Sequence, residues 1–202
     1  MQDAKEKSRA AFDRQAARYD TAYFGAHARK LYPALLDQLE QLPRQRVLDV
    51  GCGTGELLRQ MAARWPEGKY RGVDLSPEMV AIAREKLGRA ALVVQGDSEH
   101  LPVPDGWAQV VVCSDSFHHY PDPEAALREF HRVLQPGGTV LIGDTTAPPL
   151  VRGIMNRLLP FSGGGDVRLY SPRELTALLE RRFHSVVCRK ADLTSLLAQG
   201  RK

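Results

Sequence analysis

Short apolar runs recur along the chain, and longer amphipathic segments separate them. The runs lie at residues 47–50, 70–75, 91–95, 108–113 and 139–142. Their length and their content of Val, Leu and Ile are typical of strands that are buried on both faces. Because the segments between them have helical composition, the pattern predicts strands that alternate with helices. That alternation favours an α/β fold with a mainly parallel sheet.

The pattern at the two ends of the chain completes the prediction. Helices are expected at residues 3–18, 26–41 and 150–159, and two further strands are expected at residues 183–189 and 195–199. The last two strands are close enough in sequence to pair as a hairpin. The predicted strands are then seven in number.

Three glycines at alternate positions, Gly51, Gly53 and Gly55, follow the first apolar run. They allow a sharp turn and leave room for a ligand against the backbone. The dinucleotide fingerprint G-x-G-x-x-G would place a glycine where Glu56 stands. A second acid, Asp49, precedes the turn, and two acids would repel a pyrophosphate. S-adenosylmethionine, which carries a sulfonium and an ammonium group, suits them better.

The run Asp49-Val50-Gly51-Cys52-Gly53-Thr54-Gly55 resembles motif I of the class I S-adenosylmethionine-dependent methyltransferases. The helical start of the chain resembles the leader of the small-molecule members of that family. The resemblance implies a Rossmann-like, doubly wound sheet of seven strands, mostly parallel with one antiparallel strand. It also implies S-adenosylmethionine as cofactor and a small-molecule methyl acceptor, with quinone-like rings among the candidates. The acceptor atom (O, N or C) stays open.

The end of the second predicted strand carries an acid, Asp74, 19 residues after Gly55. In Rossmann-like folds an acid at this place accepts hydrogen bonds from the ribose hydroxyls, in NAD-binding proteins and methyltransferases alike. Leu75 and Met79 are positioned to flank the adenine, although Met79 could equally belong to the core.

By resemblance, Asp97 and Ser98 after Gly96 recognise the adenine, Ser114 meets the methionine end of the cofactor, and Tyr19 of the leader lies over it. Tyr19 could also serve only to pack the leader onto the protein. The expected cofactor contacts are Tyr19, Asp49, Gly51, Cys52, Gly53, Gly55, Asp74, Leu75, Met79, Gly96, Asp97, Ser98 and Ser114.

Two adjacent histidines, His118 and His119, follow the fourth predicted strand. Ligands bind beyond the carboxyl ends of the strands in doubly wound sheets, so this segment should lie near the transferred methyl group. Either imidazole could take a proton from the acceptor. The alternative is that they only pack and hydrogen-bond within the loop. The segment lacks the Asp/Asn-Pro-Pro-aromatic pattern of adenine and glutamine methyltransferases, which argues against those acceptors.

We expect a single methyltransferase domain over residues 1–202. Residues 1–42 would form a helical leader or lid, and residues 145–170, with Pro148-Pro149 and Gly163-Gly164-Gly165, would form a variable segment that covers the substrate. An NAD-dependent oxidoreductase and a non-catalytic S-adenosylmethionine-binding protein are the alternatives from other functional classes.

Length, charge and cysteine content limit the functional classes that fit this chain. The chain has 202 residues, 43% of them hydrophobic, and a net charge of +4. Residues 151–202 contain ten Lys/Arg and four Asp/Glu, a net +6, which a solvated basic surface explains better than nucleic acid. No secretory signal or membrane span is evident, and the three separated cysteines fit the cytoplasm and form no metal motif. The sequence assigns no oligomeric state.

Overall fold

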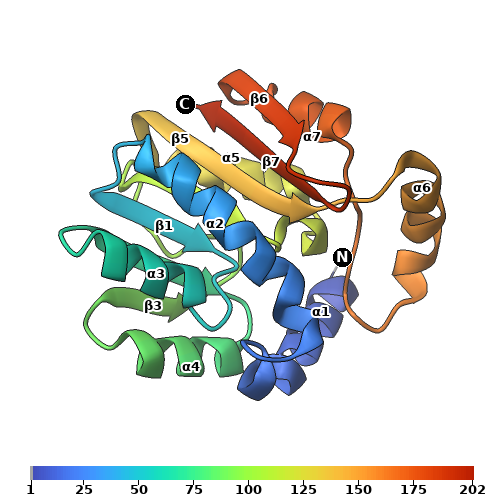
Figure 1. Ribbon diagram of the computed structural model, residues 1–202, viewed down its shortest axis with the longest axis horizontal. Helices are drawn as coiled ribbons and strands as arrows, with labels where there is room; N and C mark the ends of the chain where they lie inside the picture. Colours follow the sequence, from blue (N-terminus) through green and yellow to red (C-terminus); the bar gives the residue numbers. More distant parts are fainter. Residues whose placement is uncertain (1) are drawn as a thin grey trace.

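The computed structural model describes residues 2–202 and shows a central sheet with helices on both faces (Figure 1). The strands are β1 (Arg46–Val50), β2 (Lys69–Asp74), β3 (Ala91–Gln95), β4 (Ala108–Ser114), β5 (Leu134–Thr145), β6 (His184–Lys190) and β7 (Ser195–Arg201). They form a seven-stranded sheet in the order β3-β2-β1-β4-β5-β7-β6. Strand β7 runs antiparallel to both of its neighbours, β5 and β6, and the remaining pairs are parallel. The predicted fold class is confirmed.

Helices cover the two faces of the sheet. These are α2 (Ala26–Glu40), α3 (Glu56–Arg64), α4 (Pro77–Leu87), α5 (Pro123–Val133) and α7 (Pro172–Leu179). Two more helices, α1 (Gln2–Gln15) and α6 (Pro149–Leu158), lie outside these layers (Figure 1). Short 3₁₀ turns lie at Ala16–Arg18, Tyr23–Gly25, Phe117–His119 and Leu159–Phe161. Helices α2, α3 and α4 contribute to one core cluster, and α5 and α7 contribute to the other.

Strand β4 shows why the strands have uninterrupted apolar sequences. Val110 and Val112 belong to the core on the α2–α4 face, whereas Val111 and Cys113 belong to the core on the α5–α7 face. Successive side chains of a strand point to opposite faces, so a strand covered on both sides needs apolar residues at every position. This arrangement makes such strands easy to recognise from sequence.

The start of β5 differs from the prediction. The fifth strand was expected at residues 139–142, but β5 already begins at Leu134, and its pairing with β4 shifts between Ala108 and Val110. Gly137, at φ +74°, donates its N–H to the carbonyl of Lys202. The bend at Gly137 is therefore part of the sheet, because the backbone of Lys202, just after β7, pairs with it.

The N-terminal helix α1 lies against α4 and the turn at Phe117–His119. It thereby crosses the edge of the sheet at which the parallel strands end (Figure 1). Within residues 2–202 none of the helices combines the length and the hydropathy that a membrane span requires.

Candidate functional site

A cavity of about 870 Å³, its open mouth included, lies at the carboxyl ends of β1, β2 and β4. Strand β1 lies between β2 and β4. The strands that follow β1 in sequence, β2 and β3, are added on one side of it, and β4 and β5 are added on the other. This is the switch point of a doubly wound sheet, where ligands bind. Helix α1 and the turn after it contribute Lys5, Ser8, Phe12 and Tyr19 to the wall.

The structure brings most of the predicted cofactor contacts to this wall. The wall contains Tyr19, Asp49, Gly51, Cys52, Gly53, Asp74, Leu75, Met79, Gly96, Asp97, Ser98 and Ser114. Gly55 lies outside it. A Cβ on Gly55 would be 2.7 Å from Leu87 Cδ1, and its φ is +74°. The third glycine of the turn therefore allows α3 to pack closely on α4.

The first two glycines, unlike Gly55, line the cavity. A Cβ on Gly51 would lie 2.0 Å from Ser116 Oγ, so only glycine lets the segment after β4 approach the turn. A Cβ on Gly53, at φ +52°, would meet none of the described atoms within 4 Å. The free space above Gly53 belongs to the cavity, which is what a bound ligand requires.

Two carboxylates lie at the floor of the cavity. Asp49 is 1% exposed, and its Oδ1 has no hydrogen-bond partner in the described part of the chain. Burial, with a smaller contribution from Asp74, raises the pKa of Asp49 to about 8. Asp74 accepts hydrogen bonds from the N–H groups of Gly53 (2.8 Å) and Ser76 (2.9 Å). These bonds hold Asp74 beside the glycine turn.

The other acid of the turn, Glu56, lies outside the wall. It accepts hydrogen bonds from Arg59 and Gln60 and faces Lys86 at 3.5 Å. The side-chain hydrogen bond from Arg59 is the main reason why the pKa of Glu56 is lowered. Glu56 is therefore neutralised by its neighbours, and Asp49 and Asp74 are the acids that face the cavity beside the glycine turn.

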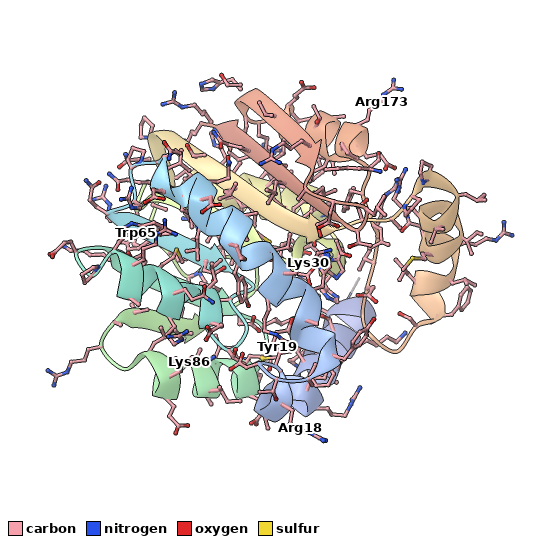
Figure 2. The ribbon with its side chains drawn as sticks, in the orientation of Figure 1. Arg18, Tyr19, Lys30, Trp65, Lys86 and Arg173 are labelled. Carbon is pink, nitrogen blue, oxygen red and sulfur yellow. The ribbon has the colours of Figure 1, made fainter. Side chains whose placement is uncertain are left out.

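The leader closes the cavity through specific contacts. Lys5 Nζ lies 2.6 Å from Asp97 Oδ2 and 2.5 Å from Glu99 Oε2. The ring of Phe12 makes an edge contact with the ring of His119, with centroids 5.0 Å apart. Tyr19 lies near the N-terminal end of α2 (Figure 2), where its carbonyl accepts a bond from Arg29. The cavity is thus covered by the chain itself.

The two histidines occupy different environments. His119 is part of the cavity wall, and burial, with the neighbouring His118, lowers its pKa to about 4. His118 lies behind the wall, where its Nδ1 is 2.6 Å from Asp144 Oδ1. Burial alone would lower the pKa of His118, but the Asp144 carboxylate outweighs it and raises that pKa well above the ordinary range. Of the two, His119 is therefore the side chain that can touch an acceptor.

Several residues of the site were missed by sequence reasoning. His27 of α2 lies 2.7 Å from Asp115, which follows β4 with an unusual φ of +51°. Asp144 lies near the end of β5, as Asp74 does on β2, and the same reasoning about acids at strand ends applies to it. Asp166 approaches the histidines from the segment after α6. Its sequence context offers no signal for that contact.

These features define a class of protein. A covered cavity at the switch point, open space above a glycine turn and a buried acid at the end of β2 are typical of a site for a nucleoside-containing cofactor. The orphaned Oδ1 of Asp49 further indicates a ligand with a hydrogen-bond donor or a positive charge. S-adenosylmethionine has both, so the residues present fit this cofactor.

Comparisons with known proteins agree. Residues 48–142 match the family model for a methyltransferase domain. The chain is 37% identical over 166 residues to the demethylmenaquinone methyltransferase of Thermus thermophilus, covering 76% of this chain and 75% of that protein. It is 35% identical over 193 residues to the malonyl-[acyl-carrier protein] O-methyltransferase of Geobacter sulfurreducens, covering 90% and 72%.

Among solved structures, the fold resembles an S-adenosylmethionine-dependent methyltransferase from Thermotoga maritima, described as a possible histamine N-methyltransferase. The TM-score is 0.74 at 21% identity, and the match covers 96% of this chain and 99% of that one. This similarity shows the fold alone. Together with the sequence matches, it establishes that the chain belongs to the class I S-adenosylmethionine-dependent methyltransferases. The cofactor is S-adenosylmethionine, and the NAD-dependent alternative falls away.

Proposed function

We propose that this methyltransferase transfers the methyl group of S-adenosylmethionine to a small, uncharged, ring-shaped acceptor such as a hydroquinone. The observation that carries the proposal is the cavity wall beneath the leader. Phe12, Tyr19, Tyr32 and His119 contribute four rings to it. Flat acceptors pack well against such rings in offset or edge-on arrangements. Because α1 covers the cavity, the acceptor must also be small enough to lie inside.

The charges of the wall favour a hydroquinone over a carboxylate acceptor. Lys5 is the one Lys or Arg among the wall residues, and it is already paired with Asp97 and Glu99. Asp49, Asp74 and Asp115 add acidic groups. A malonyl carboxylate would enter this cavity without a free cation to meet it, whereas an uncharged ring would not need one. This favours the quinone-like chemistry in the name of the Thermus thermophilus relative over that of the malonyl relative.

We propose one orientation for the cofactor in the cavity. We assign the ribose hydroxyls to Asp74 and the adenine to Asp97 and Ser98, because these residues follow β2 and β3 at one end of the cavity. The methionine end then lies near Asp49 and Ser114, both of which have a buried oxygen without a partner in the described chain. The cofactor's ammonium group can donate hydrogen bonds to these oxygens.

Catalysis then depends mainly on alignment. The bound cofactor supplies a methyl group that its sulfonium already activates. Holding an acceptor in line with that methyl group can contribute on the order of 7–11 kcal/mol. We propose that His119, from the wall, contacts the acceptor, and that His118, fixed by Asp144, positions His119 from behind. The contact between the two rings supports these roles, since the centroids of the His118 and His119 rings are 4.1 Å apart.

The remaining parts of the chain have supporting roles in this proposal. Residues 1–42 serve as the leader that must open for exchange, and residues 145–170 cover the acceptor side of a single domain. Lys5 and Phe12 of α1 already contact the cavity wall, which supports the role of the leader. Three free thiols, Cys52, Cys113 and Cys188, favour the cytoplasm as the place of the reaction.

The test uses S-adenosylmethionine with an isotopically labelled methyl group and four acceptors: a naphthohydroquinone, a benzohydroquinone, a malonyl thioester and a primary amine. We expect labelled product from a hydroquinone and none from the thioester. Transfer to the thioester alone would refute the proposed acceptor class. Cofactor binding without transfer to any of the four would instead favour the non-catalytic binding protein.

A further inference from the structure

Two histidines and a carboxylate meet where the turn after β4 contacts the segment after α6. His118 Nε2 and His119 Nδ1 each lie 3.4 Å from Oδ1 of Asp166. This distance is longer than the about 2.7–3.2 Å of a good hydrogen bond. It matches the roughly 3.3–3.4 Å between neighbouring ligand atoms around a tetrahedral ion with bonds of about 2.0–2.1 Å.

The state of His119 points independently to a ligand at this place. Its side chain is 11% exposed, and its Nδ1 has no hydrogen-bond partner among residues 2–202. A buried polar atom left without a partner costs roughly 1–3 kcal/mol, so such atoms are rare in folded proteins. A metal ion between His119 and Asp166 would satisfy this nitrogen, because imidazole nitrogen is a common metal ligand.

His118 is already oriented as a metal ligand would be. Its Nδ1 lies 2.6 Å from Asp144 Oδ1, and the Asp144 side chain is 2% exposed. A carboxylate on one ring nitrogen fixes the orientation of the imidazole and leaves the other nitrogen for the metal. In His118 that other nitrogen, Nε2, is the one that faces Asp166.

Asp166 is held in place by its own segment. The N–H groups of Val167 and Arg168 donate to the carbonyl of His118 at 2.9 and 3.1 Å. Gly165, at φ +77°, passes so close to α1 that a Cβ there would be 2.4 Å from the Cα of Ser8. The backbone that carries Asp166 is therefore held beside the turn that carries the two histidines.

We propose that His118, His119 and Asp166 bind one divalent transition-metal ion, for which Zn²⁺ is the best match, with a fourth position open to an oxygen ligand. Two histidines and a carboxylate form a ligand set that proteins use for zinc sites with an open position. Because His119 also belongs to the cavity wall, an acceptor hydroxyl can supply the fourth ligand, and the ion then replaces the direct contact of His119 with the acceptor. That use of the ion rests on the proposed function, whereas binding of the ion does not.

The experiment titrates tag-free protein, stripped with a chelator, with Zn²⁺ against a chromophoric competitor, and with Co²⁺ by visible absorption. Asp166→Asn is the test variant, since its side chain is 32% exposed and the fold should tolerate the change. Asp37→Asn, an exposed acid of α2, is the matched control. S-adenosylmethionine binding is measured by calorimetry on the same samples, with and without chelator.

We expect one Zn²⁺ per chain, at least tenfold weaker binding in Asp166→Asn, unchanged binding in Asp37→Asn, and the visible band of tetrahedral Co²⁺ in the original protein. Equal Zn²⁺ affinity in Asp166→Asn would overturn the site. So would an absence of stoichiometric binding, or a near-ultraviolet thiolate–cobalt band that places the ion on a cysteine. Zinc binding without cofactor binding would count against the proposed function alone, and cofactor binding without zinc against the metal site alone.

Discussion

Replacing Asp49 by Asn should stabilise the cofactor-free protein while weakening its affinity for the cofactor. The Asp49 side chain lies at the floor of the cavity, 1% exposed, and its Oδ1 has no partner among the described residues. Burial raises its pKa from 3.8 to about 8. Asn has nearly the same shape but cannot ionise, so the variant separates the charge of the group from its size.

The magnitude follows from the linkage between protonation and folding. In the unfolded chain Asp49 ionises above its ordinary pKa of 3.8, whereas in the folded protein it holds its proton until about pH 8. A raised pKa of an acid means that its contribution to stability is complete below pH 4 and is lost as the pH rises toward 8. At pH 7 the difference from 3.8, at about 1.36 kcal/mol per pH unit, gives an upper limit of about 4 kcal/mol.

Asn removes this cost but introduces an amide NH₂ group that needs a partner, at a cost of about 1–3 kcal/mol. We therefore expect a net gain of about 1–2 kcal/mol at pH 7. For a chain of this length that corresponds to a rise in Tm of roughly 2–8 °C. Near pH 4 the advantage should vanish or reverse, because the folded chain is protonated at this position and the unfolded chain is close to its ordinary pKa of 3.8, so little of the cost of protonating Asp49 on folding remains.

Cofactor binding should respond in the opposite direction. The cofactor's ammonium group favours the ionised form of Asp49, so binding at pH 7 should release a proton. Asn cannot provide the charge, and the loss of a hydrogen bond to a charged group, about 1.5–3 kcal/mol, predicts at least about tenfold weaker binding. Calorimetry in two buffers with different ionisation enthalpies measures the released proton, which should be absent in Asp49→Asn.

The assays are thermal unfolding between pH 4 and pH 8 and calorimetry at pH 7, with Asp37→Asn on the exposed side of α2 as control. If Asp49→Asn were destabilised equally at pH 5 and pH 7, the carboxyl would be ionised in the folded protein, and the reasoning from burial would fail. A wild-type enthalpy of cofactor binding that is the same in both buffers would contradict the proposed contact with the ammonium group.

Three further predictions concern the same cavity. Gly53→Val should abolish measurable cofactor binding by calorimetry, because a branched side chain would fill space that is free above the turn; near-normal affinity would show that the ligand lies elsewhere. Asp74→Ala should weaken binding by about 1–3 kcal/mol through the loss of ribose hydrogen bonds, and an unchanged Kd would remove Asp74 from the ribose site. Lys5→Ala should speed cofactor dissociation severalfold in stopped-flow measurements, because the contacts of Lys5 with Asp97 and Glu99 join the leader to the cavity wall. Dissociation at the wild-type rate would mean that the contact of Lys5 with Asp97 does not hold the leader closed.

The strands of the sheet were predictable because a strand that is buried on both faces has apolar residues at successive positions. Val110, Val111, Val112 and Cys113 of β4 are all fully buried, so the apolar run is continuous. The predicted start of β5 was wrong because the observed start depends on Lys202, whose backbone pairs with Gly137 and Gly138 across the sheet. Local turn chemistry at these glycines indicates a bend but does not reveal that the bend is part of a strand pairing.

The cavity wall at the ends of β1 and β2 was predictable for a related reason. Its residues follow the ends of β1 and β2 in short segments, and each segment carries its own chemistry, such as the glycine turn and the acid Asp74. Gly55 shows the limit of this reasoning, because its contact with Leu87 of α4 is a packing constraint with the same sequence appearance as a ligand-binding glycine.

The group of side chains around the two histidines is built in a different way. His119, Asp144 and Asp166 come from the turn after β4, the end of β5 and the segment after α6, and His27 of α2 joins them through Asp115. Only the tertiary fold brings these groups together, so their chemistry has no motif. The cofactor is the same throughout the family, whereas the relatives of this chain bear names with unlike acceptors, one a quinone and one a malonyl thioester. The motif that marks the cofactor is local in sequence, whereas the rings and charges of the cavity wall come from distant segments, so the wall can vary between relatives while the motif stays the same. The acceptor should therefore be inferred from the rings and charges of that wall, and in this chain they favour an uncharged ring.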